Sequence, residues 1–234
     1  FGVSGISKIV AMNNVEQVER TIAFVKETLQ GAEGGHDWFH IQRVFNNSLL
    51  IAKDENVDIQ IVSLSALLHD IADAKFHSGD ESIGPQIARE FLTSLGIAFS
   101  VIDHVVMIIE NISYKSSLES KADKRGVKRF NSAELQVVQD ADRLDAIGAI
   151  GIARAFNYGG FMDRELYNPN IDPNLQMDKD AYKNSKAPTI NHFYEKLLLL
   201  KDQMNTASGK KLAQERHQFM LKYLEQFYKE WNGV

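Results

Sequence analysis

The stretch Leu64–Lys75 places chemically active side chains at the end of a long apolar run. Residues 58–74 carry apolar groups on almost every side, which predicts a buried helix rather than an amphipathic surface helix. The run ends in the adjacent pair His69 and Asp70. An ionised carboxylate is very unfavourable in an apolar interior without a partner, and a neutral imidazole beside it suits a divalent metal ion. A capped helix end, whose His and Asp bind backbone groups, fits this stretch equally well.

Two histidines and an arginine converge beside a glycine break earlier in the chain. Gly34 and Gly35 interrupt the helical pattern, and His40 and Arg43 share a stripe of the helix predicted to follow, one turn after His36. A lone histidine here would more often be structural, but the set favours a site. The core stripe of the same helix is predicted at Ile41, Val44, Phe45, Ser48, Leu49 and Ala52.

A third stretch, residues 137–151, inserts charged groups into an otherwise apolar helix with small residues for close packing. Asp142 and Asp145 share a face of this helix, whereas Asp140 points elsewhere. The pattern again predicts buried charges that need partners. The helix is predicted to be capped by Asn131 or Ser132.

The composition is that of an ordinary globular protein. The 234 residues are 44% hydrophobic and 24% charged, which is enough for a core, and the absence of cysteine excludes disulfides, thiolate metal sites and a cysteine nucleophile. The net charge of −5 argues against a stable nucleic-acid partner. No apolar run reaches transmembrane length and no cleavable signal is visible, so we expect a cytoplasmic protein without a membrane partner.

The remaining apolar periodicity is helical, with no convincing strand alternation, so the predicted fold class is all-α. Helices are expected over about residues 15–29, from Gly84–Pro85 to Gly96, and from a capping box at Ser100–Asp103 to about Ile112. Two helices close the chain. Their inward residues are predicted to be Phe193, Leu197, Leu200 and Met204 in the first, and Leu212, Phe219, Tyr223, Leu224, Phe227 and Trp231 in the second.

The candidate metal ligands are His40, His69, Asp70 and Asp142, each on a predicted helix. Two imidazoles and two carboxylates suit Mn²⁺, Fe²⁺, Co²⁺, Ni²⁺ or Zn²⁺ better than Ca²⁺. The order His, His-Asp, Asp resembles the HD superfamily of metal-dependent phosphohydrolases, and the longer motifs resemble its bacterial YpgQ/YedJ-like branch. The resemblance runs from about residue 15 to the end and is carried by Gly35–Val44, Ala66–Lys75, Asp140–Gly148 and Asn191–Leu198.

The resemblance implies an all-helical HD-domain bundle with additional C-terminal helices. It predicts one domain over 1–234, with a core at about 15–155 and a C-terminal helical part at about 156–234 packing on it. It further implies one divalent metal ion, most often Mn²⁺, with Fe, Co, Ni, Zn or Mg as alternatives. For this branch it points to a nucleotide pyrophosphohydrolase that releases a nucleoside monophosphate and pyrophosphate from a nucleoside triphosphate. The substrate would then be a small nucleotide or another phosphorylated molecule, and a homodimer is left open.

Residue roles follow from the resemblance together with the chemistry. Asp73 matches a catalytic carboxylate position in related ppGpp-hydrolysing HD enzymes and would orient or deprotonate the attacking water, with support of a metal ligand as its alternative role. The family signature Ala-Asp-Arg-Leu places the last ligand at Asp142, although Asp140 stands two residues away and competes with it. Phosphate charge would be neutralised by His36, Arg43, Lys75 and Arg143, each of which could instead pair with a nearby Asp, and a substrate wall would include His192 and Lys196.

Other functions remain open on the sequence alone. A phosphodiesterase or phosphomonoesterase of the same fold would use the same ligands, and a non-catalytic ligand-sensing domain would keep the fold. A di-iron oxygenase needs extra histidines between the His-Asp pair and the last Asp, and only His77 and His104 lie there. The intact ligand set therefore favours the hydrolase.

Overall fold

The computed structural model describes residues 3–31, 37–72, 80, 82–112, 130–176 and 186–234. Over these residues the chain is helical and contains no strand, so the predicted all-α class is confirmed. The chain divides into two compact units, residues 1–141 and 142–234. The boundary falls inside one helix, and the prediction of a single domain over 1–234 stays a prediction.

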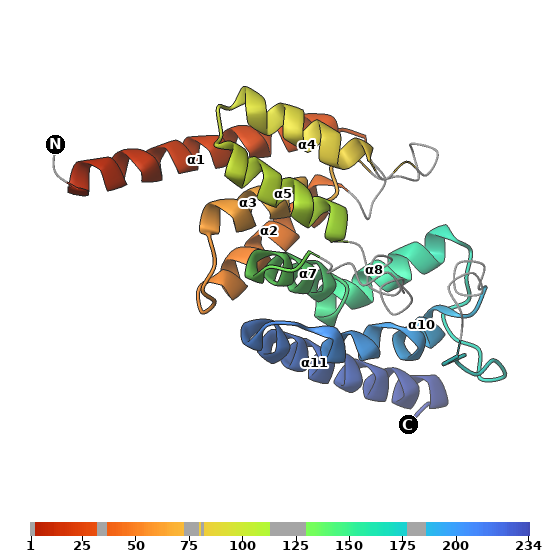
Figure 1. Cartoon of the computed structure of the whole chain (residues 1–234). Helices are drawn as coiled ribbons and strands as arrows, with labels where there is room; N and C mark the ends of the chain where they lie inside the picture. Colours follow the sequence, from red (N-terminus) through yellow and green to blue (C-terminus); the bar gives the residue numbers. More distant parts are fainter. Residues whose placement is uncertain (1–2, 32–36, 73–79, 81, 113–129, 177–185) are drawn as a thin grey trace, which may run out of the picture. The chain divides into compact units, whose positions relative to one another are not determined.

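The described residues of the first unit fold into helices (Figure 1). Asp37 and Asp58 start two of them, because each side chain accepts hydrogen bonds from backbone N–H groups of the first turn. The helices are α1 (Val3–Thr28), α2 (Trp38–Ala52), α3 (Ile59–Leu68), α4 (Ile83–Ser94) and α5 (Phe99–Asn111), followed by α7 (Ala133–Asp145), whose last turn belongs to the second unit.

Helix α3 is the centre of the first unit. Every residue from Ile61 to Leu68 is buried, and α3 contacts α1, α2 and α5. The buried helix predicted over residues 58–74 is therefore confirmed as far as Leu68, where it ends. The core stripe predicted for α2 is confirmed at Ile41, Val44, Ser48 and Ala52. The shared core includes Val25, Ile41, Leu64, Leu67, Leu92, Ile102 and Val105.

One local expectation in this unit was wrong. The capping box at Ser100–Asp103 does not form, because α5 begins two residues earlier than that box requires and its N-cap is Ala98, which makes no side-chain cap hydrogen bond. Ser132 does act as predicted, since its Oγ accepts a hydrogen bond from Leu135 N at 3.1 Å at the start of α7.

The acidic stretch is not one continuous helix. It breaks between α7 and α8 (Gly148–Phe161), where Gly148 adopts φ +76°, a backbone conformation that favours glycine. The side-chain stem of Arg216 lies against Gly148, and a Cβ there would meet that stem at 3.0 Å. A side chain at Gly151 would overlap the carbonyl oxygen of Ala146. The close packing that we predicted for the small residues of this stretch is found at Gly148, against Arg216, whereas at Gly151 the near neighbour is the backbone of the preceding turn.

The second unit continues from the last turn of α7 through α8 to α10 (Thr189–Glu195), the 3-10 helix η2 (Leu197–Gln203) and α11 (Ala207–Asn232), which lies against α8 and η2 (Figure 1). The predicted inward residues Phe193, Leu197, Leu200 and Met204 are all buried. In α11 the prediction was partly wrong, because Phe219 and Trp231 are about half exposed. Leu224 is buried as predicted, and Ala213 and Met220, which were not predicted, complete the buried stripe.

Candidate metal centre

His40 enters the candidate site from the first turn of α2. Its backbone N–H donates to Oδ1 of the N-cap residue Asp37 at 2.9 Å, and its side chain is buried, with the residue 3% exposed. The cap fixes where the helix begins. Because His40 lies three residues after this cap, the cap also fixes the position of the His40 side chain on the first turn of α2.

His69 is the C-cap residue of α3, so the helix end considered from the sequence does exist. Its ring Nδ1 lies 2.9 Å from the carbonyl oxygen of Ala66. A protonated Nδ1 that donates to Ala66 presents the lone pair of Nε2 on the other side of the ring, which is the arrangement common among metal-ligating histidines. The helix end and the metal-ligand interpretation are thus compatible.

Asp142 completes a group of three candidate ligands. Ligand atoms of His40, His69 and Asp142 all lie within 4.8 Å of one another, and the two imidazole centroids are 5.4 Å apart. Because α7 is continuous, its first-unit residues up to Ala141 carry Asp142 directly. Two ligands that each lie about 2.1 Å from a metal ion are at most about 4.2 Å apart. Small side-chain rotations would therefore close this group around one ion, and the two nitrogens and one carboxylate fit a transition metal.

Of the two competing aspartates, one lies in the group of three. Asp140 is fully buried and does not belong to it, whereas Asp142 does. Asp70 follows His69 directly and is partly buried, but it is not in this group. Its predicted role as a ligand stays a prediction.

Basic side chains of the second unit lie near Asp142. Burial lowers the pKa of the Lys196 ammonium, the Asp142 carboxylate raises it, and Arg154 lowers it further. Burial also lowers the pKa of His192 to about 4, with the positive charges of Lys196 and Arg164 as additional causes. His192 is therefore a neutral imidazole at pH 7, beside two cations.

Three arginines hold the last turn of α7 within the second unit. Arg143 donates to the carbonyl oxygen of Gln203 at 2.9 Å, Arg216 donates to the carbonyl oxygen of Leu144, and Arg154 forms an ion pair with Asp145. The contact with Gln203 gives Arg143 a structural role, and its predicted phosphate binding stays a prediction.

Sequence reasoning missed Arg154, Arg164 and Arg216. The signal available for Arg154 was the buried Asp145, which needs a cation. The turn at Gly148 places Arg154 next to Asp145, nine residues earlier in the chain. Residues nine apart are not neighbours on a continuous helix, so helical periodicity does not predict this pair.

The other predicted site residues are only partly placed. Arg43 lies on α2, three residues after His40, and is partly buried. His36, Asp73 and Lys75 lie outside the described residues. The roles proposed for these four side chains stay predictions.

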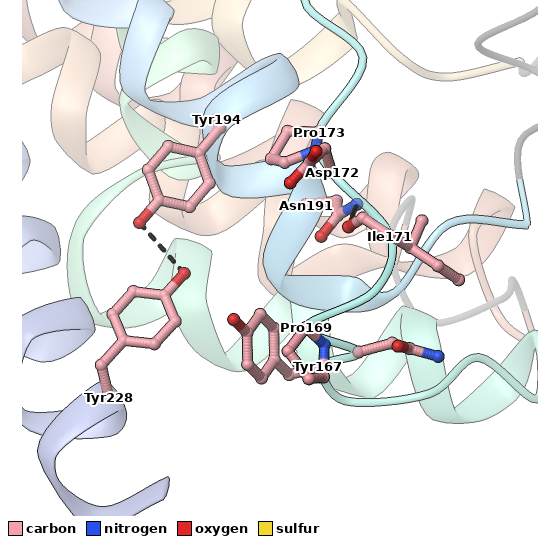
Figure 2. Close-up of a pocket in the computed structure, with 9 residues that line it drawn as sticks. Tyr167, Pro169, Ile171, Asp172, Pro173, Asn191, Tyr194 and Tyr228 are labelled. Atoms are coloured by element: carbon pink, nitrogen blue, oxygen red, sulfur yellow. Dashed lines mark hydrogen bonds between the residues drawn. The ribbon is translucent and has the colours of Figure 1, made fainter. Parts of the chain in front are cut away.

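A cavity of about 250 Å³ opens elsewhere in the second unit, and Figure 2 shows it. The hydroxyl groups of Tyr194 and Tyr228 point toward each other, with their oxygens 3.1 Å apart, and Tyr167 and Asp172 line the same cavity. None of the predicted site residues lines this cavity. We therefore place the candidate centre at the His–Asp group and not at this cavity.

The HD domain family model matches residues 38–147, a range that contains His40, His69 and Asp142. The uncharacterised protein YpgQ of Bacillus subtilis (strain 168) is 35% identical over 225 residues, covering 95% of this chain and 98% of that protein. The uncharacterised protein L803 of Acanthamoeba polyphaga mimivirus is 28% identical over 186 residues, covering 70% and 74%.

Solved structures agree with these matches. An HD-superfamily hydrolase from Bacillus thuringiensis is 40% identical with a TM-score of 0.75, covering 94% of this chain and all of that one. Bacillus subtilis YpgQ, crystallised in complex with ADP, is 35% identical with a TM-score of 0.70, covering 93% and 96%.

In the part of this chain that the structure describes, no helix is long and apolar enough to cross a membrane.

Proposed function

The chain belongs to the HD-domain superfamily of hydrolases, and on that basis we propose that it is a metal-dependent phosphohydrolase that acts on nucleotides. The observation that carries the proposal is the group of His40, His69 and Asp142, whose ligand atoms lie within 4.8 Å of one another. The ADP bound to the YpgQ crystal structure supports a nucleotide as the ligand. The reaction that we propose is hydrolysis of a nucleoside triphosphate to a monophosphate and pyrophosphate.

The proposed site holds one divalent ion, preferably Mn²⁺. His40 and His69 would bind it through neutral imidazoles, and Asp142 would bind it through its carboxylate, with Asp70 as a further ligand. When bound, the ion polarises a phosphoryl oxygen and lowers the pKa of a water molecule. The two nearly buried imidazoles would keep bulk water away from one side of the site.

In the proposed reaction, the oxygen of a water molecule attacks the α-phosphorus and the bond to the α,β-bridging oxygen breaks. The proton of that water passes to Asp73, and pyrophosphate leaves with the bridging oxygen. Lys196 and Arg143 would stabilise the negative charge that develops on the leaving group, together with His36, Arg43 and Lys75. His192 would line the substrate site with a neutral imidazole that can form a hydrogen bond.

The test is an incubation of the purified protein with Mn²⁺ and a panel of ribonucleoside and deoxyribonucleoside triphosphates, ADP, a nucleoside monophosphate and a cyclic nucleotide. Product analysis should find monophosphate and pyrophosphate from at least one triphosphate. Orthophosphate as the only product would indicate a phosphomonoesterase instead. Opening of the cyclic nucleotide alone would indicate a phosphodiesterase.

Two variants make the assay specific for the proposed centre. His69→Gln should abolish turnover, because it removes a proposed ligand. His104→Gln is the matched control, since His104 bonds Ser132 in the first unit and is not in the group of three. We expect it to retain turnover. No product from any substrate, or equal activity in both variants, would reject the proposal.

A further inference from the structure

The cavity of about 250 Å³ in the second unit has walls that are rich in tyrosine. It is lined by Tyr167, Tyr194 and Tyr228, and the ring centroids of Tyr167 and Tyr228 are 5.4 Å apart (Figure 2). The Tyr167 ring also packs against Trp231, with the two centroids 5.0 Å apart. A cation that is attracted to an aromatic ring lies within about 6 Å of the ring centroid. One cation can therefore lie within this range of both Tyr167 and Tyr228.

Asp172 is the only charged side chain among the described residues that line the cavity. None of the described residues forms an ion pair or a hydrogen bond with its carboxylate. Burial raises the pKa of Tyr228, as do its hydrogen bond with Tyr194 and the neighbouring Tyr167, so the Tyr228 hydroxyl is neutral at pH 7. The described lining therefore combines one negative charge with ring faces and phenolic oxygens, all of which attract a positive charge.

The segment that carries Asp172 is fixed to α10 on both sides of this residue in the chain. Asn191 Nδ2 donates to the carbonyl oxygen of Ile171 at 2.9 Å, and Asn174 N donates to Glu195 Oε1 at 3.0 Å. Asn191 is itself 1% exposed and lines the cavity. These contacts hold the cavity open in one shape, and a preformed site saves the entropy of ordering its walls when a ligand binds.

Volume and chemistry together select the kind of ligand. A water molecule occupies about 30 Å³ in the liquid, so the cavity has room for about eight non-hydrogen atoms. A calcium ion takes about six to eight oxygen ligands, whereas this lining supplies a single carboxylate and much ring and proline surface. A phosphate group has the same sign of charge as Asp172. A small organic cation matches both the carboxylate and the apolar walls.

We propose that this cavity binds an organic ammonium ion, with Tyr167, Tyr194 and Tyr228 around the positive group and Asp172 as its counter-charge. The proposal goes beyond the proposed function, because it uses neither the metal ligands nor a nucleotide. The ammonium group can belong to a free amine or to a lysine side chain of another protein. Both sources present the same chemical group to the cavity.

The test is a calorimetric titration of the full-length protein with choline. The control ligand is 3,3-dimethyl-1-butanol, which has the shape of choline but carries carbon in place of the charged nitrogen. Choline should bind at least about tenfold more tightly than this neutral analogue, because only choline gains the cation–π and carboxylate interactions. Addition of Mg²⁺ at constant ionic strength should not displace it.

Spermidine and a short peptide that contains trimethyllysine distinguish the two sources of the ammonium group. Tighter binding of spermidine than of the peptide would support the site with a free amine as its ligand. Tighter binding of the peptide would support the site with a partner protein as its ligand.

Substitutions of Asp172 and Tyr167 locate the binding in the cavity. Asp172→Asn should weaken choline binding by about 3- to 10-fold and leave the neutral analogue unaffected, because it removes only the charge. Asp202→Asn is the matched control, since Asp202 is exposed, pairs with Lys201 and does not line the cavity. Tyr167→Leu should weaken choline binding by about 3- to 30-fold, whereas Tyr167→Phe, which keeps the ring, should stay within about threefold of the wild type.

Equal affinities for choline and the neutral analogue would overturn the proposal, and so would no binding of choline, spermidine or the peptide at tens of millimolar. Displacement of choline by Mg²⁺ would overturn it as well, because the site would then take an inorganic cation. If Tyr167→Leu does not fold, Asp172→Asn decides the test, since Asp172 is exposed and its carboxylate has no partner among the described residues. Choline binding that is unchanged in Asp172→Asn would place the ligand outside this cavity and reject the proposal.

Discussion

His192 should make the stability of this protein depend on pH in a way that one substitution removes. Burial and the charges of Lys196 and Arg164 lower the pKa of its imidazole from 6.5 to about 4 in the folded chain. In the unfolded chain the imidazole has its ordinary pKa. Between these two values the unfolded state binds a proton that the folded state does not, so the contribution of His192 to stability is present above pH 6.5 and is lost as the pH falls toward 4.

The size of the effect follows from the shift. At pH 8 the imidazole is neutral in both the folded and the unfolded state, so unfolding is not accompanied by proton uptake at His192. At pH 5 the unfolded imidazole is protonated, 1.5 pH units below its pKa, while the folded imidazole is still mostly neutral. At about 1.4 kcal/mol per unit, the free energy of unfolding should fall by about 2 kcal/mol between pH 8 and pH 5 on account of this residue alone.

The assay compares urea unfolding of the wild type and His192→Gln at pH 8 and at pH 5. Other titrating groups, among them His217, whose pKa is lowered by burial and by Lys201, contribute to both proteins and cancel in the comparison. The wild type should lose about 2 kcal/mol more than the variant. Equal losses in the two proteins would refute the reasoning, because His192 would then titrate normally in the folded state.

Three further substitutions test the packing of the second unit. Gly151→Ala should lower the free energy of unfolding by about 1–3 kcal/mol, because a Cβ there overlaps a backbone carbonyl of the preceding turn. Gly160→Ala is its control, since nothing lies within 4 Å of a Cβ at that position, and equal effects of the two would contradict the account. Thr206→Ala should cost about 1 kcal/mol in chemical denaturation, because the Thr206 hydroxyl caps α11 by accepting from Gly209 N at 2.9 Å, and no loss would contradict the cap. Phe193→Ala should cost about 3–5 kcal/mol, since Phe193 is fully buried, and a drop of the melting temperature by less than a few degrees would argue against that burial.

Much of the fold could be predicted because apolar periodicity is a local signal. The apolar run over residues 58–74 indicated a buried helix, and the structure has one that is buried from Ile61 to Leu68 and ends there. The last helix shows the limit of that signal. Phe219 and Trp231 recur at helical spacing and were predicted to face inward, yet Ala213 and Met220 form the buried stripe. Aromatic residues are common on surfaces, so their periodicity alone does not fix a face.

The candidate centre was predicted better than its surroundings. The residue types at His40 and His69 predicted a metal site, and the structure brings both close to Asp142. The sequence left Asp140 and Asp142 as alternatives, because it does not give the orientation of α7. The partners of Asp145 could not be predicted. The ion pair with Arg154 depends on the turn at Gly148, and a glycine in a helical pattern is compatible with both close packing and a chain reversal.

The most direct test of the central claim is the Mn²⁺ stoichiometry of the purified protein, measured by calorimetric titration after chelation of bound metals. The account predicts one ion per chain for the wild type and for His104→Gln. It predicts loss of that ion when His69 is replaced by Gln or Asp142 by Asn, because each change removes one of the three converging ligands. One ion per chain that is bound with unchanged affinity after both replacements would contradict it.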